Sequence, residues 1–172
     1  MTDLLKIKNE YYDLVSNRVS GGKYKQILVC GGSGCTSNHS KDILNRFKEL
    51  CKDMKDIHIV SPGCFGLCAM GPSAIIFPEQ AFYHNLTVEK VDQIFENHIK
   101  NGKIDIENCY NVKDGKLVDL YDMPFFKKQR RIVLHNCGLT APGKIEEYIA
   151  RDGYFALQKV LGNDSRASYR RG

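Results

Sequence analysis

Four cysteines lie in two short glycine-rich loops. Cys30 and Cys35 flank the residues GGSG, and Cys64 and Cys68 flank the residues FGL. Each pair follows a β-rich run, so two loops at the same edge of a sheet would bring the four thiols together. A 2Fe-2S cluster needs four thiolates, two on each iron, and glycines let backbone N–H groups approach the sulfurs. The spacing therefore favours an iron–sulfur centre at Cys30, Cys35, Cys64 and Cys68.

Three alternatives compete for the same cysteines. Buried cysteines pack as small hydrophobic side chains, although four in two short loops would be an improbable packing choice. Zinc sites built from four cysteines usually have only two residues between paired ligands. A thiol–disulfide oxidoreductase would use a Cys-x-x-Cys motif, which the sequence does not contain. The alternative function left open is a cluster-free or zinc-bound interaction domain that docks onto a larger oxidoreductase.

The other cysteines and the histidines indicate no second site. Cys51 falls on the apolar face of a predicted helix, Cys137 is expected in packing or a turn, and Cys109 is expected to be exposed. The histidines are scattered along the chain, so surface or core roles are favoured for His39, His58, His84, His98 and His135. No catalytic site emerges, and whether the chain is part of an enzyme stays open.

Composition and charge exclude several classes of function. The 172 residues carry 25 basic and 20 acidic side chains, a net charge of +5 spread along the chain, so nucleic-acid binding is not supported. Residues 1–20 contain many charges and no signal-peptide core, and the uncharged stretch 59–78 is interrupted by prolines and glycines, so membrane insertion is not expected. Seven cysteines fit metal or redox chemistry in the cytoplasm. The densest basic cluster is expected to be a solvated face: Lys127, Lys128, Arg130 and Arg131.

The elements that must position the cysteines form an α/β pattern. An amphipathic helix is predicted before residue 20, strands are predicted at 26–30 and 57–60, and a helix capped by Ser40 lies between them. Strands at 74–77 and 81–84 then form a hairpin before a helix capped by Thr87. A β-α-β half followed by a β-β-α half predicts a thioredoxin-like mixed sheet with flanking helices.

The chain divides into four predicted parts. Residues 1–102 form the thioredoxin-like domain, residues 103–124 a polar linker, residues 125–161 a leader segment, and residues 162–172 a tail. The leader is expected to contain a strand at 131–134 and a helix at 144–161 that is interrupted at Gly153. Its apolar residues have no evident partner, so mobility or self-association as a homodimer is favoured over folding back onto the first domain.

Four stretches of the sequence resemble a known family. ILVCGGSGCTS and SPGCFGLCAMGP are similar to the thioredoxin-like 2Fe-2S ferredoxin domain. FFKKQRRIVLHNCG and IEEYIARDGYFAL are similar to the segment that leads into the FMN- and NADH-binding domain of the flavoprotein subunit of NADH dehydrogenases and NAD-dependent, electron-bifurcating hydrogenases. The resemblance covers about residues 5–161. It implies that Cys30, Cys35, Cys64 and Cys68 take the positions of the cluster ligands.

The sequence departs from that family after the leader. The glycine-rich phosphate loop, the FMN pocket and the later cysteines for a 4Fe-4S cluster are absent from it, so we do not expect flavin chemistry or NADH oxidation in this chain. We expect an electron-transfer module that passes single electrons through a 2Fe-2S cluster. Its expected partners are flavoprotein or iron–sulfur subunits of an NADH-dependent oxidoreductase or hydrogenase complex.

Overall fold

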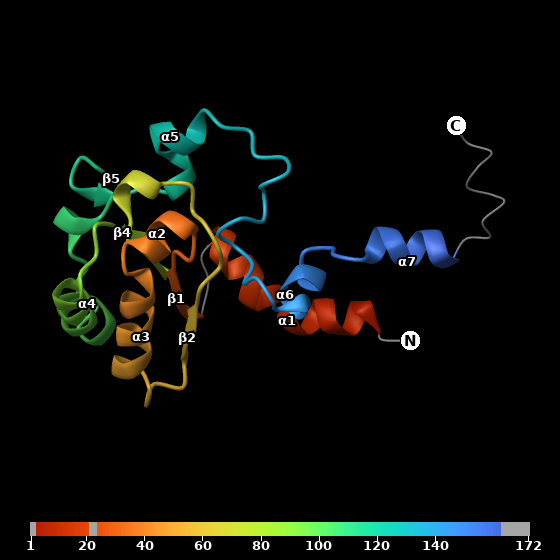
Figure 1. The fold of residues 1–172 in the computed structure, drawn as a ribbon, viewed down its shortest axis with the longest axis horizontal. Coiled ribbons are helices and arrows are strands. Elements are labelled where there is room, and N and C mark those ends of the chain that lie inside the picture. The colour runs from red at the N-terminus through yellow and green to blue at the C-terminus, as the bar shows by residue number, and fades with distance from the viewer. Residues whose placement is uncertain (1–2, 21–23, 163–172) are drawn as a thin grey trace.

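The computed structural model describes residues 3–20 and 24–162 (Figure 1). The elements up to residue 100 are α1 (Leu4–Ser20), β1 (Lys25–Val29), α2 (Ser33–Ser37), α3 (Ser40–Leu50), β2 (Ile57–Val60), a 3-10 turn (Cys68–Met70), β3 (Ala74–Phe77), β4 (Ala81–Tyr83), α4 (Val88–Ile94) and a π-helical turn (Phe95–Lys100). No helix in the described ranges is long and apolar enough to cross a bilayer.

The strands form one mixed sheet in the order β2-β1-β3-β4. β1 runs parallel to β2 and antiparallel to β3, and β3 and β4 form the predicted hairpin. Ile27 in the middle of β1 therefore pairs with Ile59 on one side and Ile76 on the other. The β-α-β half followed by the β-β-α half, with a mixed sheet and flanking helices, confirms the predicted fold class.

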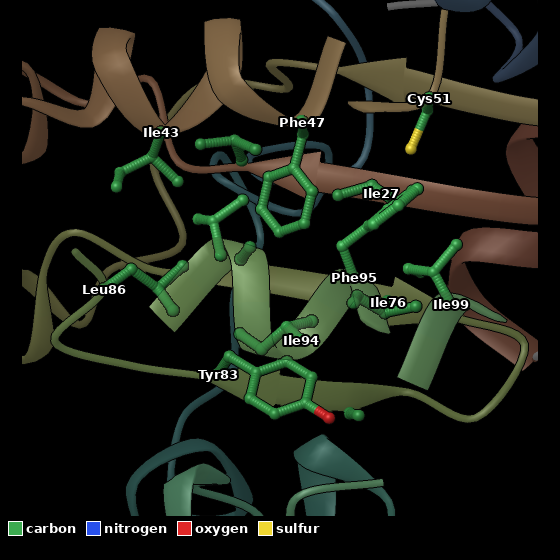
Figure 2. Packing of buried hydrophobic residues seen from close by; sticks show 14 of the residues in the cluster. Ile27, Ile43, Phe47, Cys51, Ile76, Tyr83, Leu86, Ile94, Phe95 and Ile99 are labelled. Carbon is green, nitrogen blue, oxygen red and sulfur yellow. The ribbon is translucent and has the colours of Figure 1, made fainter. Parts of the chain in front are cut away.

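The sheet buries apolar side chains on both faces because alternate residues of a strand point to opposite sides. Ile27 belongs to the core beneath α3 and α4, where Figure 2 shows Phe47 reaching from α3 toward the sheet. Leu28, the next residue of β1, belongs to a second core together with Phe65 and Phe126. Two cores on opposite faces fix the register of β1, and with it the place where the first cysteine loop begins.

The two predicted helix caps have different outcomes. The hydroxyl oxygen of Thr87 accepts a hydrogen bond from the Lys90 amide at 3.3 Å, so Thr87 caps α4 as expected. Ser40 is the first residue of α3 and not its cap. The preceding residue, His39, has a left-handed backbone (φ 65°) and no side-chain capping bond.

Residues 103–124 pack against the sheet, which corrects the expectation of a polar linker with few anchors. Cys109 forms an isolated β-bridge with Tyr83 at the free edge of β4, and the Tyr110 amide donates to the Phe82 carbonyl at 2.8 Å. β5 (Val112–Lys113) and β6 (Lys116–Leu117) then form a small hairpin, after which Leu120 is buried beneath the sheet. A domain boundary after residue 102 remains a prediction.

The C-terminal part also departs from the sequence expectation. After α5 (Pro124–Lys127), residues 131–134 lie in a bend and turn rather than in the predicted strand, because they pair with no neighbouring strand. The predicted helix is interrupted near Gly153 as expected, giving α6 (Ile145–Ala150) and α7 (Phe155–Gly162). α6 packs against α1, while α7 extends away from the rest of the molecule (Figure 1). Of the predicted tail, residues 163–172 lie outside the described residues.

The anchoring of residues 103–124 can be tested at Asn111, which is fully buried. Its side-chain oxygen accepts from the Phe82 amide at 3.0 Å, and its amide nitrogen donates to the carbonyls of Gln80 and Val118 at 2.9 and 2.6 Å. Asn111→Ala leaves these buried groups unpaired, at about 1–3 kcal/mol for each group. We expect a lower free energy of unfolding in urea and faster hydrogen exchange of the Phe82 amide.

Asn97 provides the matched control, because it is exposed. Asn97→Ala should change neither the unfolding midpoint nor the exchange of the Phe82 amide. Equal stability of the Asn97 and Asn111 variants would mean that residues 103–124 are not anchored through Asn111.

Candidate metal centre

The two cysteine loops meet because β1 and β2 are parallel neighbours and end at the same edge of the sheet. A backbone hydrogen bond joins the loops directly, from the Gly31 amide to the Gly63 carbonyl at 2.9 Å. The Cys30 amide donates to the Ser73 carbonyl, also at 2.9 Å, and so ties the first loop to the segment that enters β3. Three chain segments are therefore held together around the cysteines.

The first loop contains a short helix that the glycine-rich sequence did not suggest. α2 carries Cys35 on its buried side, and the Thr36 amide donates to the Gly32 carbonyl at 2.9 Å. At the end of α2, the Asn38 side-chain amide donates to the Gly71 carbonyl at 3.0 Å. The helix thus fixes the direction of the Cys35 thiol between the two loops.

The structure brings the four predicted cysteines together as two pairs. The Cys30 and Cys35 thiols are within hydrogen-bonding reach of each other, and so are those of Cys64 and Cys68. The pairs also lie close enough for charge on one pair to affect the other. Cys30 and Cys35 are buried, whereas Cys64 is partly exposed and Cys68 is exposed. The site therefore has an inner pair and an outer pair.

Burial and neighbouring thiols raise the pKa of Cys35 and of Cys64. Burial raises the pKa of Cys35 to about 12, and the neighbouring thiols Cys30, Cys64 and Cys68 add to this effect. The pKa of Cys64 is also raised by burial, although the Gly66 amide opposes the shift by donating to Cys64 Sγ at 3.2 Å. Since a metal binds the thiolate form, metal binding at these sulfurs must release protons.

Glycine is required where the backbone passes close to the thiols. A Cβ on Gly71 would lie 2.5 Å from Cys35 Sγ, and one on Gly32 would lie 3.0 Å from Cys64 Sγ. A Cβ on Gly34 would meet Cys68 Sγ at an ordinary contact distance of 3.9 Å. These close approaches leave backbone, rather than side chains, around the sulfurs. Such a surrounding suits an iron–sulfur cluster, because hydrogen bonds to its sulfurs help to set its potential.

Within the described residues, no three His, Cys, Asp or Glu side chains are gathered as a ready site for a single metal ion. The thiols form pairs instead. A 2Fe-2S cluster uses two cysteines on each iron, whereas zinc takes all four ligands around one centre. The two pairs match the two cysteines that each iron of a 2Fe-2S cluster requires.

The remaining cysteines and histidines take part in other contacts. Cys51 is buried in the core below α3, as expected, while Cys109, expected to be exposed, is buried and donates to the Asp105 carbonyl at 3.3 Å. Burial raises the pKa of Cys109 to about 12. Cys137 is exposed in a turn. His39 pairs with Asp42 at 3.3 Å, and His58 packs against Tyr24.

Sequence reasoning missed two residues that shape the site. Phe65, between the second pair of cysteines, is buried and packs edge-on against Phe82 with ring centroids 5.8 Å apart, which anchors the second loop to the sheet. Gly138, far along the chain, donates its amide to the Pro62 carbonyl at 3.1 Å. An aromatic residue inside a glycine-rich loop could have indicated the first, but no local pattern indicates the second.

Comparison with known proteins points to the same cofactor as the four cysteine thiols do. The family description "thioredoxin-like 2Fe-2S ferredoxin" matches residues 9–98, about half of the chain. The chain belongs to this family. Its cofactor is therefore a 2Fe-2S cluster, and the class of function is electron transfer.

Individual relatives of this ferredoxin cover the same part of the chain. A 2Fe-2S ferredoxin from Clostridium pasteurianum is 36% identical over 73 residues, which are 41% of this chain and 72% of the relative. A 2Fe-2S ferredoxin from Aquifex aeolicus is 26% identical over 93 residues, 47% of this chain and 84% of the relative. A crystal structure of the thioredoxin-like 2Fe-2S ferredoxin from Aquifex aeolicus is 24% identical with a TM-score of 0.48, covering 53% of this chain and 100% of that one.

The close approach at Gly71 gives a test of the site in this ferredoxin. Gly71→Ala places a methyl group 2.5 Å from Cys35 Sγ, so the Cys35 thiol must move and we expect loss of most of the bound iron and sulfide. Iron and sulfide analysis of anaerobically purified protein measures this loss. The far-ultraviolet circular dichroism of the variant should still show a folded chain.

Gly34→Ala is the matched control from the opposite loop, because its new Cβ meets Cys68 at ordinary distances of 3.8 and 3.9 Å. Gly34 also has no left-handed backbone that would strain an alanine. This variant should retain its iron. Equal iron contents in the Gly34 and Gly71 variants would contradict the close approach.

Proposed function

We propose that Cys30, Cys35, Cys64 and Cys68 hold the 2Fe-2S cluster of this ferredoxin. The observation that carries the proposal is the convergence of these four thiols as two pairs at one sheet edge. The positions of the other three cysteines support this choice. Cys51 and Cys109 are buried in the core beneath α3 and α4, and Cys137 lies in an exposed turn.

The chain would orient and shield this centre. When bound, a 2Fe-2S cluster takes up and releases one electron at a time. Cys30 and Cys35 hold the protected side, while the exposed Cys68 marks the side nearest to a partner. No charged residue lies between Gln26 and Asn38 or between Ile59 and Pro78, so the surroundings are apolar or neutral. We expect a potential on the order of −400 mV, as in all-cysteine plant-type centres.

Single substitutions test the ligand assignment. Replacing any one of the four proposed ligands with Ala removes one thiolate from iron, so we expect loss of most of the visible absorption and of the EPR signal of the reduced protein. The matched controls are Cys109→Ala and Cys137→Ser, which should retain two irons and two sulfides per chain. Equal bleaching in a control variant would show that the ligand assignment is wrong.

We further propose that the electron partner is a flavoprotein or iron–sulfur subunit of an NADH-dependent oxidoreductase or hydrogenase complex. Two observations support this proposal. The strings at 125–138 and 145–157 are similar to the leader of an NADH-binding flavoprotein subunit. This leader lies beside the second cysteine loop, where the Gly138 amide meets the Pro62 carbonyl.

The partner would dock on a surface formed by residues 125–134. Ile132, Val133 and Leu134 are 68%, 90% and 58% exposed, and consecutive aliphatic side chains in water indicate an interaction site. Exposed basic residues stand beside them: Lys127, Lys128 and Arg130. Two copies of this surface would repel each other by charge, so an acidic partner with an apolar recess fits it better than a homodimer does.

Charge reversal tests the docking surface. We expect Lys127→Glu/Lys128→Glu to slow electron transfer to a purified NADH-oxidising flavoprotein subunit by more than tenfold at low salt, because electrostatic steering is lost. Stopped-flow absorbance measures the rate, and the difference from wild type should shrink as salt is raised.

The matched control is Lys52→Glu/Lys55→Glu, which reverses two exposed lysines in the turn between α3 and β2. That turn lies at the opposite end of the sheet from the cysteine loops (Figure 1). Transfer rates that fall equally in both double variants would contradict the docking surface, as would a stable dimer whose interface contains Val133.

We also propose a cytoplasmic location. All seven cysteines are free thiols, and the cytoplasm is the compartment that keeps thiols reduced. The four proposed ligands have to remain reduced in order to bind iron.

A further inference from the structure

A buried ion pair joins α1 to the C-terminal segment. Arg18 of α1 and Glu147 of α6 have side chains that are 0% and 1% exposed. Two hydrogen bonds connect them, from Arg18 Nη1 to Glu147 Oε2 at 2.6 Å and from Nη2 to Oε1 at 3.1 Å. Burial alone would raise the pKa of Glu147, but Arg18 and the Ala141 amide outweigh it and lower that pKa, so the carboxylate is charged.

The same two side chains also bind the backbone between Gly138 and α6. Arg18 Nη1 donates to the Leu139 carbonyl at 2.6 Å, and the Ala141 amide donates to Glu147 Oε2 at 2.7 Å. Arg18 Nε donates to the side chain of Gln26 in β1 at 2.8 Å. The ion pair therefore fixes residues 139–141 relative to the strand from which the first cysteine loop emerges.

The residues on either side of the fixed segment 139–141 lie next to the second cysteine loop. The Gly138 amide donates to the Pro62 carbonyl at 3.1 Å. A Cβ on Gly138 would lie 2.9 Å from the Phe65 ring and 3.4 Å from the Cys64 carbonyl oxygen. Further along, a Cβ on Gly63 would be 3.8 Å from the ring of Pro142. Gly138 is thus hydrogen-bonded to Pro62 and passes close to Cys64 and Phe65, and Pro142 lies beside Gly63.

We propose that residues 138–142 are a fixed cover over the second cysteine loop, and that Arg18 and Glu147 are the positioning residues that hold it in place. The inference rests on the proposed function, because Cys64 is a proposed cluster ligand. The family match ends at residue 98, so the cover is an addition to the matched domain. By shielding the Cys64 side of the centre from water, the cover protects the cluster from loss and oxidation.

Hydrogen exchange of the holoprotein tests the cover without measuring electron transfer. In Arg18→Met/Glu147→Met, apolar side chains of similar length fill the space, but the bonds to Leu139 and Ala141 are lost. We expect amides of residues 64–67 to exchange at least tenfold faster than in wild type, while amides of α3 keep their wild-type rates. Visible absorption should also decay at least threefold faster in air.

The exposed pair between Lys8 and Asp152 provides the matched control. It bridges α1 and the turn after α6 at 2.6 Å, so it joins the same parts of the chain, but the Asp152 side chain is 72% exposed. Exposed ion pairs contribute little to the stability of a fold. Lys8→Met should leave the exchange of residues 64–67 unchanged.

A second variant keeps the proposal testable if the double variant does not fold. Gly138→Ala leaves the ion pair intact but drives a methyl group into Phe65, so it should also speed exchange at residues 64–67. Suppose that a variant is folded and that its residues 138–150 exchange freely. Wild-type amide exchange rates at residues 64–67 in that variant would contradict the proposed cover. Failure of the ligand assignment would appear separately, as retained iron after removal of a proposed ligand cysteine.

Discussion

The hydrogen bond from the Gly31 amide to the Gly63 carbonyl is the contact on which the site depends. The inner and outer thiol pairs come from loops that are about thirty residues apart in sequence, and each loop alone presents only two sulfurs. The loops can meet because β1 and β2 are parallel neighbours that end at the same edge. Crossing from one parallel strand to the next requires a connection such as α3, which buries Phe47 against the sheet. The parallel pairing of β1 and β2 therefore brings the two loops together and also requires α3 and the core beneath it.

The close range of the thiols imposes a second constraint, since burial and neighbouring thiols raise the pKa of both Cys35 and Cys64. The groups placed close to these sulfurs are backbone atoms of glycines rather than charged side chains. Gly71 and Gly32 let the chain pass within a few ångströms of the sulfurs, and the Gly66 amide already donates to Cys64. A positive side chain would lower a thiol pKa more strongly, but it would also change the charge felt by an electron at the centre. Neutral dipoles stabilise thiolates without adding a net charge.

The parts predicted correctly from sequence are those set by local pattern. Short β-rich runs bounded by turn residues predicted the four strands, and Thr87 caps α4 as its position suggested. Apart from the cap at Ser40, the errors share one physical origin, which is that contacts between distant residues leave no local signal. Polar residues 103–124 suggested a linker, yet the buried Asn111 binds the backbone of β4 through its side chain. Likewise, the aliphatic residues at 131–134 suggested a strand, but no neighbouring strand is available to them. Which cysteines bind iron remains a prediction, although the structure brings the four together.

The ion pair between Arg18 and Glu147 ties the C-terminal segment to α1 and β1. Removing two charges from water costs several kcal/mol per ion, and apolar residues of similar volume often serve stability equally well. Loss of only one partner costs about 3–5 kcal/mol, because the other charge is left buried and alone. A buried ion pair of this kind therefore contributes more to the placement of the segments it joins than to the free energy of unfolding. Each hydrogen bond of Arg18 and Glu147 joins a defined atom of β1, α6 or the backbone of residues 139–141. Such directional bonds specify one arrangement, whereas an apolar contact would tolerate small shifts. We therefore expect residues 138–142 to keep one position against the second cysteine loop without strand pairing.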